Sequence, residues 1–201
     1  MTFIHTVPES EATGDVAAMY ETDREVFGHL PNLTRGFSLR PDVYAAWRQL
    51  NGAIKANMDL RRYELATVAA ARRLRSSYCT LAHGSVLLDK FLSPEAVRAL
   101  VGDQNTPELD AVDAAVVALA DKVARDATSV TEDDIDRLRS LGLTDTEIFD
   151  VVAAAAVCCF FSKALDGLGI EADAKYAQLD PELRDALTVG RPISETDLNS
   201  P

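Results

Sequence analysis

The sequence has few cysteines, few aromatic residues and fewer basic than acidic residues. Three cysteines in 201 residues are too few for a disulfide framework. Aromatic residues make up only 6%, whereas alanine and leucine are abundant, and this composition favours packed helices over sheets. Lys and Arg number 20 against 32 Asp and Glu. The resulting net charge of −12 argues against partners such as nucleic acid or an anionic membrane surface.

No segment resembles a secretion signal or a membrane span. The N-terminal stretch MTFIHTVPES lacks a basic region followed by an apolar run. The longest apolar run, residues 151–161, is too short to cross a bilayer. An apolar content of 47% over 201 residues is typical of one globular domain. We therefore expect a cytoplasmic protein with a single domain over residues 1–201, a core over about 13–170 and a C-terminal tail.

Apolar residues recur three and four positions apart along most of the chain, which predicts an all-α, single-domain bundle of roughly eight to ten helices. The helix over 144–168 is apolar on nearly every side, so we expect it to be buried in the core or against another subunit. The predicted helical segments are residues 13–27, 30–40, 41–57, 64–75, 78–91, a short helix from 93, 109–127, 131–141, 144–168 and 182–188.

The stretch over residues 64–88 contains the only Cys and His that are one helical turn apart. Ser76 and Ser77 offer hydroxyls that can cap a helix beginning near Tyr78. Cys79 would then lie in the first turn of that helix, where free N–H groups and the helix dipole favour a thiolate.

His83 follows Cys79 by four residues and so shares its helix face. Together with the upstream acid Glu64, these residues form a set able to activate a nucleophile. The residues alone leave a second interpretation open, in which Cys79 is a small buried apolar residue and His83 a core histidine. The acids over 131–134 suit a helix start, and we expect neither a metal site nor a cofactor site.

The same stretch resembles the core motif of the alkylhydroperoxidase-D-like, or carboxymuconolactone-decarboxylase-like, superfamily. Redox members carry a Glu, eleven further residues, Cys-x-x-Cys, three residues and a His. Glu64, Cys79 and His83 match this motif in register, and Ser76 stands at the position of the first Cys. The flanking residues resemble the peroxidase-related branch, and weaker similarity covers most of residues 13–170.

This resemblance implies a homo-oligomer with a thiol-based peroxidase-like activity on a small-molecule peroxide. Cys79 would become a sulfenic acid, with His83 as base or proton donor and Glu64 orienting it. Ser76 cannot resolve a sulfenic acid as a thiol does. An external thiol reductant, or Cys158 or Cys159, would therefore have to resolve it, unless redox turnover is lost.

Two other functions remain open at the level of the sequence. The superfamily includes decarboxylases that lack the cysteine pair, so His83 and Glu64 could transfer protons on a small carboxylated substrate. Alternatively, the chain could be a non-catalytic oligomer that binds a small ligand, which the absence of a thiol at Ser76 favours.

Overall fold

The computed structural model describes residues 2–196, and within these it has ten α-helices, three short 3-10 helices and no strand, as the sequence predicts. The α-helices are α1 (Gly14–Phe27), α2 (Asn32–Gly36), α3 (Pro41–Lys55), α4 (Leu60–Arg73), α5 (Ser77–Lys90), α6 (Pro94–Val101), α7 (Ala111–Asp126), α8 (Glu132–Ser140), α9 (Asp145–Gly167) and α10 (Pro181–Leu187). The 3-10 helices are η1 (Glu9–Glu11), η2 (Ala127–Ser129) and η3 (Ala174–Gln178).

Local sequence signals set several of the helix ends. Gly28 ends α1 in the left-handed conformation, with φ of 75°, which a glycine adopts without strain. Ser93 caps α6 by accepting a hydrogen bond from the Ala96 N–H, and Pro94 follows at the first helical position. Thr144 and Glu147 form a reciprocal capping box at the start of α9. These boundaries agree with the predicted helices to within a few residues.

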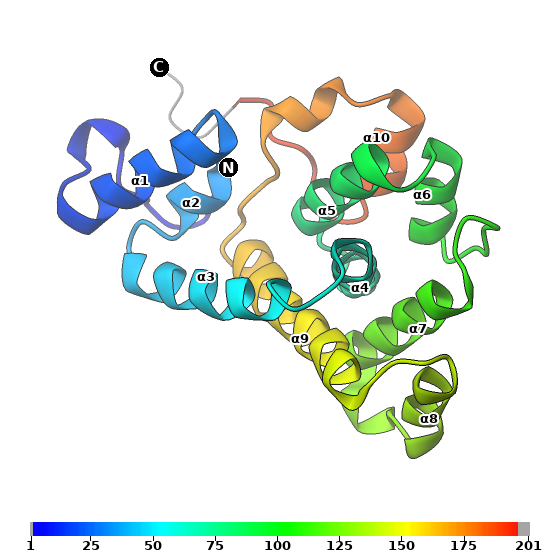
Figure 1. Ribbon diagram of the computed structural model, residues 1–201. Helices are drawn as coiled ribbons and strands as arrows, with labels where there is room; N and C mark the ends of the chain where they lie inside the picture. Colours follow the sequence, from blue (N-terminus) through cyan, green and yellow to red (C-terminus); the bar gives the residue numbers. More distant parts are fainter. Residues whose placement is uncertain (1, 197–201) are drawn as a thin grey trace.

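Helix α4 lies at the centre of the molecule, where Figure 1 shows it nearly end-on with the other helices around it. It packs against α5, α7 and α9. Residues 63–71 are all buried, and four of them are alanines. Small side chains let neighbouring helices approach α4 closely from several sides. Any charged side chain in this segment is therefore enclosed by protein.

Helix α9 runs diagonally beneath α4 and supplies a large part of the core (Figure 1). Among the described residues it is the one helix whose length and composition would suffice to cross a membrane. However, 56% of its most apolar segment is buried inside the chain, which is the behaviour of a core helix. Its outer face remains apolar, since Phe149 and Phe160 expose 68% and 48% of their surface.

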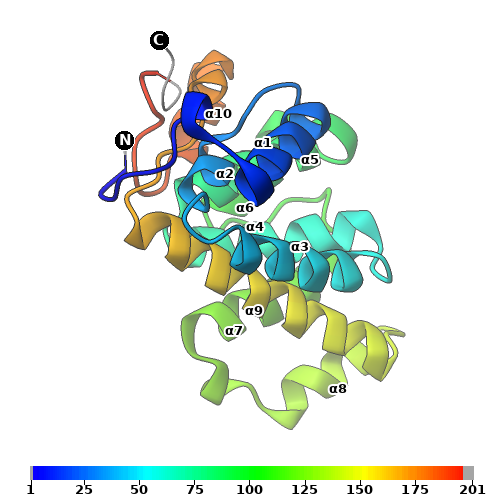
Figure 2. The ribbon, with the colours of Figure 1, turned by 90° about the vertical axis from the view of Figure 1, so that its left-hand side faces the viewer.

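The C-terminal segment folds back onto the body of its own chain, where α10 lies against α5 and α6 (Figure 1). In Figure 2, α10 lies near the top of the molecule. Leu187 is fully buried and packs so closely on Gly84 that a Cβ at residue 84 would come within 2.6 Å of it. Thr80 Oγ1 also donates a hydrogen bond of 2.7 Å to the Leu187 carbonyl oxygen. Residues beyond 170 thus contribute to the core, and residues 197–201 of the predicted tail lie outside the described range.

A fully buried carboxylate joins the first three helices. Asp23 of α1 accepts hydrogen bonds from Thr34 Oγ1 at 2.5 Å and from Tyr44 Oη at 2.7 Å, and it pairs with Arg48. These partners lie on α2 and α3. Because α3 also carries Trp47, Asn51 and Lys55, the Asp23 cluster fixes the helix that forms one wall of the site described below.

We expect Asp23→Ala to lower the free energy of unfolding by about 2 to 3 kcal/mol, because two buried hydroxyls lose their acceptor. Denaturant titration measures this change. Glu25→Ala, an exposed position on the same helix, serves as the control and should change stability by less than about 0.5 kcal/mol. Equal stability of the two variants would show that the Asp23 cluster does not hold α1, α2 and α3 together.

Candidate active site

Cys79 lies in the first turn of α5, as the sequence predicts. The chain turns sharply between α4 and α5, where Arg75 adopts a left-handed φ of 57° and the Ser76 N–H donates to the Ala71 carbonyl oxygen at 3.0 Å. Only 3% of the Cys79 surface is exposed. The thiol is therefore inside the protein, next to the free N–H groups of a helix N-terminus, which stabilise a thiolate.

The serine hydroxyls before Cys79 do not cap α5 in the predicted way. Ser76 occupies the N-cap position but its side chain makes no capping hydrogen bond. Its buried Oγ lies near Cys79 and Asp166, without a well-aligned hydrogen-bond partner in the part of the chain that the structure describes. The Ser77 hydroxyl accepts a hydrogen bond of 2.8 Å from the Gly190 N–H. The Ser77 hydroxyl, which the sequence predicts as a helix cap, therefore binds the C-terminal segment instead.

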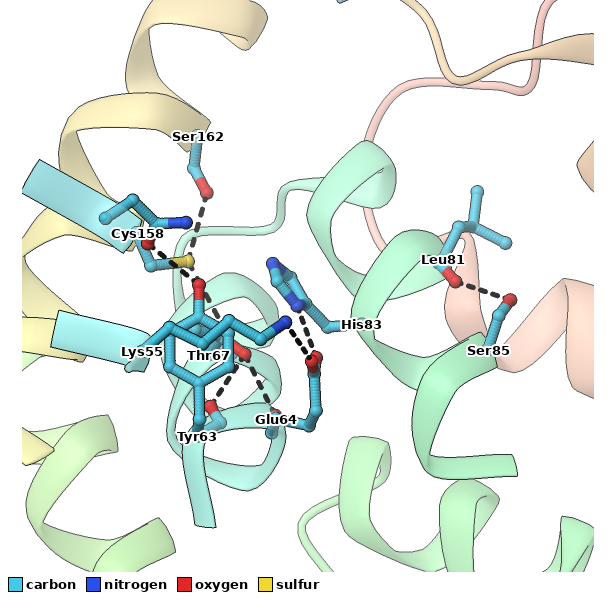
Figure 3. A network of polar contacts seen from close by, with 10 residues as sticks. Lys55, Tyr63, Glu64, Thr67, Leu81, His83, Ser85, Cys158 and Ser162 are labelled. Atoms are coloured by element: carbon cyan, nitrogen blue, oxygen red, sulfur yellow. Dashed lines mark hydrogen bonds and ion pairs between the residues drawn. The ribbon is translucent and has the colours of Figure 1, made fainter. Parts of the chain in front are cut away.

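The predicted acid and base are in direct contact. Glu64 Oε2 lies 2.6 Å from His83 Nδ1, and Glu64 Oε1 accepts a hydrogen bond of 3.1 Å from Lys55 Nζ (Figure 3). Glu64 is 1% exposed, whereas the His83 side chain is 25% exposed. Lys55 could not be predicted as part of the site, because it comes from α3 and approaches Glu64 only through tertiary packing.

Burial and pairing act in opposite directions on the pKa values of these groups. Burial alone would lower the pKa of His83 and raise that of Glu64. The hydrogen bond and the opposite charges outweigh burial, so the pKa of His83 is raised and that of Glu64 is lowered. Lys55 adds a second positive charge that lowers the Glu64 pKa further. Both shifts favour an imidazolium paired with a carboxylate.

Cys79 has a second thiol as its neighbour. The neighbouring Cys158 side chain is the largest cause that lowers the pKa of Cys79, to about 7, against the opposing effect of burial. The positive charge of His83 lowers it further. The same contact and burial raise the pKa of Cys158 well above the usual range. Cys79 is thus the sulfur of the pair that ionises more readily, and Cys158 stays protonated and donates to the Thr67 carbonyl oxygen.

Cys158 is fixed in the middle of α9 and is buried. Its Sγ lies 3.5 Å from the Thr67 carbonyl oxygen and 3.6 Å from Ser162 Oγ (Figure 3). The next residue, Cys159, is rotated by about 100° around the helix and is partly exposed. Of the two cysteines that the sequence leaves as core residues or as resolving thiols, Cys158 and not Cys159 lines the same cavity as Cys79.

A small cavity joins the two thiols to His83. Its volume is about 10 Å³, close to the space that a single water molecule occupies. The walls are mostly apolar or aromatic, and no Lys, Arg, Asp or Glu contributes to them. The lining residues are Trp47, Asn51, Tyr63, Thr67, Cys79, His83, Val157, Cys158 and Phe161.

A larger apolar groove lies next to this cavity, between α3 and α9. It has a volume of about 570 Å³ and shares Trp47 and Val157 with the small cavity. The Trp47 ring stacks on Phe161 with centroids 3.8 Å apart, so these rings separate the groove from the thiols. Trp47 Nε1 is buried and has no hydrogen-bond partner among the described residues.

The arrangement suits a nucleophilic thiolate with a proton donor beside it. Glu64 holds Nδ1 of His83, which leaves Nε2 for the cavity. Within residues 2–196, no group of three or more His, Cys, Asp and Glu side chains is placed to hold a metal ion. The structure brings Glu64, Cys79 and His83 together, as the sequence predicts, whereas the contribution of Lys55 and the place of Cys158 in the same cavity were not predicted.

Comparison with known proteins gives no match to a family model or to a curated sequence. Among solved structures, the chain is similar to an alkylhydroperoxidase AhpD core, an uncharacterized peroxidase-related protein from Ralstonia eutropha JMP134. The TM-score is 0.76 at 19% identity, covering 94% of this chain and 98% of the other. An uncharacterized peroxidase-related protein from Silicibacter sp. TM1040 aligns with a TM-score of 0.74 at 22% identity, over 86% of this chain and 92% of that one.

A third similar structure is a cysteine-to-alanine variant of the debrominase Bmp8 in complex with 2,3,4-tribromopyrrole. It aligns with a TM-score of 0.68 at 16% identity, covering 93% of this chain and 96% of the other. At such identities the comparisons establish the fold, and proteins with different activities share it. The resemblance found in the sequence is therefore confirmed at the level of architecture: this chain shares its all-α fold with the alkylhydroperoxidase AhpD core and the peroxidase-related protein.

Proposed function

We propose that the protein is a thiol-based peroxidase in which Cys79 is the nucleophile. The observation that carries this proposal is the shared cavity, where the buried Cys79 meets an imidazole held by Glu64. A pKa of about 7 leaves a large share of Cys79 as thiolate at neutral pH.

In the proposed reaction the Cys79 thiolate attacks the terminal oxygen of a hydroperoxide. The O–O bond breaks, the sulfur keeps one oxygen, and the other oxygen departs with its alkyl group. His83, whose pKa is raised, donates a proton to the departing oxygen so that an alcohol is released. Glu64 and Lys55 hold the imidazole in place. Thiol-based reduction then returns Cys79 to its starting state, which the cytoplasmic location expected from the sequence would support.

The cavity walls favour this reaction over decarboxylation. A small carboxylated substrate would need a cationic group to bind it, and His83 is the only such group in the cavity. Lys55 is engaged with Glu64. The cavity beside Cys79 has mostly apolar or aromatic walls, which supports an uncharged organic hydroperoxide as the substrate.

The second candidate function is thiol-dependent removal of bromine from an aromatic ring. The aromatic wall formed by Trp47 and Phe161 beside a thiolate favours it, together with the structural likeness to the debrominase Bmp8. Bromide release from 2,3,4-tribromopyrrole in the presence of a dithiol is the corresponding assay. Peroxide consumption without bromide release supports the first candidate, and the reverse result supports the second.

We also propose that two copies of the chain associate through the apolar face formed by α3 and α9. Leu50 and Phe160 expose 55% and 48% of their surface there and line the groove. Isolated exposed apolar residues are common, but a continuous apolar groove of this size is costly to leave in water. A second copy would cover the groove and remove its apolar side chains from water.

The proposed association predicts a stable oligomer at micromolar concentration in sedimentation experiments. Leu50→Asp should shift the protein to monomer, because a carboxylate would be buried in the contact. Val26→Asp changes an equally exposed apolar residue on α1 and should leave the oligomer intact. A native protein that sediments as a monomer would remove this part of the proposal.

The proposed chemistry predicts that Cys79→Ser reduces peroxide consumption to the uncatalysed rate, because the nucleophile is absent. His83→Gln should lower the rate by about 100-fold, the usual contribution of a positioned proton donor. Cys159→Ser serves as a matched control outside the cavity, and its rate should equal that of the native protein. Substantial activity in Cys79→Ser would mean that another group reacts with peroxide.

The pKa shift predicts a pH dependence that can be measured without a bound substrate. Thiolate absorbance in the ultraviolet, taken as the difference from Cys79→Ser, should rise with pH and reach its midpoint near pH 7. In Glu64→Gln the pKa of His83 falls, so less positive charge remains beside the sulfur. The midpoint should then move upward, toward the ordinary cysteine value of about 8.5. An unchanged midpoint would show that Glu64 does not contribute to lowering the pKa of Cys79.

A further inference from the structure

We propose that Cys158 is the resolving cysteine of this protein and forms a disulfide with Cys79 that links α9 to α5. This inference rests on the proposed thiol chemistry at Cys79. The inference gives Cys158 a role in the reaction. This residue lies far from the motif in the sequence, and the local sequence pattern predicts only that it belongs to an apolar core helix.

Placement of the two sulfurs carries the inference. Cys79 and Cys158 line the same small cavity, and both are buried. Helices α5 and α9, which carry the two cysteines, pack against each other. The Cys158 side chain is also held by the Thr67 carbonyl oxygen and the Ser162 hydroxyl, so it stays aimed at the cavity. A disulfide requires two cysteines on closely packed, converging backbones.

The other possible partners of Cys79 do not meet this requirement. Ser76, at the position where the redox motif has its first Cys, provides an oxygen that cannot form a disulfide. Cys159 does not line the cavity, and its charged neighbour is Lys163. Among the described residues, Cys158 is thus the thiol that stands next to the reactive sulfur.

The protonation states of Cys79 and Cys158 determine that Cys79 reacts with peroxide before Cys158 attacks Cys79. In the resting state burial and the neighbouring Cys79 thiolate keep Cys158 protonated, so only Cys79 is ready to attack peroxide. Oxidation to the sulfenic acid removes the negative charge from Cys79. The contact that raised the Cys158 pKa then weakens, and Cys158 becomes able to attack.

The second step, in which Cys158 attacks the Cys79 sulfenic acid, needs no oxidant beyond the peroxide already consumed. The Cys158 sulfur attacks the Cys79 sulfur, the S–S bond forms and the S–O bond breaks. The hydroxyl group of the sulfenic acid leaves with the Cys158 proton as water. An external dithiol then reduces the disulfide to two thiols and is itself oxidised to a disulfide. His83, on the wall of the same cavity, is placed to pass the proton to the leaving hydroxyl.

Mass spectrometry after one equivalent of cumene hydroperoxide tests the inference directly. The native protein should lose two hydrogen atoms, and peptide mapping should join Cys79 to Cys158. Cys158→Ser keeps a hydroxyl donor beside the Cys79 thiolate but cannot form the disulfide. This variant should gain one oxygen, trappable by dimedone at Cys79, and should lose dithiol-dependent turnover after the first equivalent.

The control is Cys159→Ser, which should form the Cys79–Cys158 disulfide and turn over like the native protein. A native protein that forms a dimedone adduct at Cys79 but no disulfide with Cys158 would overturn the inference and leave the proposed peroxidase function standing. If Cys79 is not oxidised at all, the proposed function itself fails. Full turnover by Cys158→Ser would also overturn the inference, since an external thiol would then resolve Cys79 directly.

Discussion

The ion pair between the buried carboxylate of Glu64 and His83 is the interaction on which the site depends. Glu64 lies in the most enclosed part of the central helix, where an unpaired charge would cost several kcal/mol. His83 from α5 and Lys55 from α3 supply the opposite charges. One buried charge therefore sets the relative positions of three helices. It also keeps a positively charged imidazole one helical turn from Cys79, so stabilisation of the core and activation of the thiol have a common cause.

Much of this arrangement could be predicted from the sequence because it rests on local patterns. Apolar periodicity and capping residues define the helices, and the four-residue spacing places His83 and Cys79 on one face. The position of Glu64 came from its place in a recognised motif, and the 2.6 Å contact with His83 agrees with it. Features that depend on packing between distant segments could not be predicted. Lys55 reaches Glu64 from another helix, and Gly190 takes the Ser77 hydroxyl that would otherwise have been free to cap α5.

The placement of Cys79 and Cys158 in one cavity also depends on packing between distant segments, so it could not be predicted from the sequence. A cysteine inside an alanine-rich apolar helix has no local signal that distinguishes a reactive thiol from a core residue, and Cys158 and Cys159 look equivalent in sequence. The distinction arises from the rotation of one residue around α9, which directs one sulfur into the cavity and leaves the other at the edge of the core. Ser76 at the position of the motif's first cysteine therefore does not by itself exclude a disulfide with Cys79, because the second sulfur can come from a different helix.

Placing that second sulfur on α9 changes what oxidation does to the protein. Two cysteines within one helical turn close a local ring, whereas a bond between α5 and α9 cross-links two core helices. Bond formation draws the sulfur atoms closer than their non-bonded contact, and a close-packed interior resists such a movement. The cavity of about 10 Å³ beside both thiols provides room for the side chains to rotate. A void that would otherwise weaken the packing therefore has a role in the proposed cycle, and the apolar wall of Trp47 and Phe161 shields the sulfenic acid from bulk solvent while the disulfide forms.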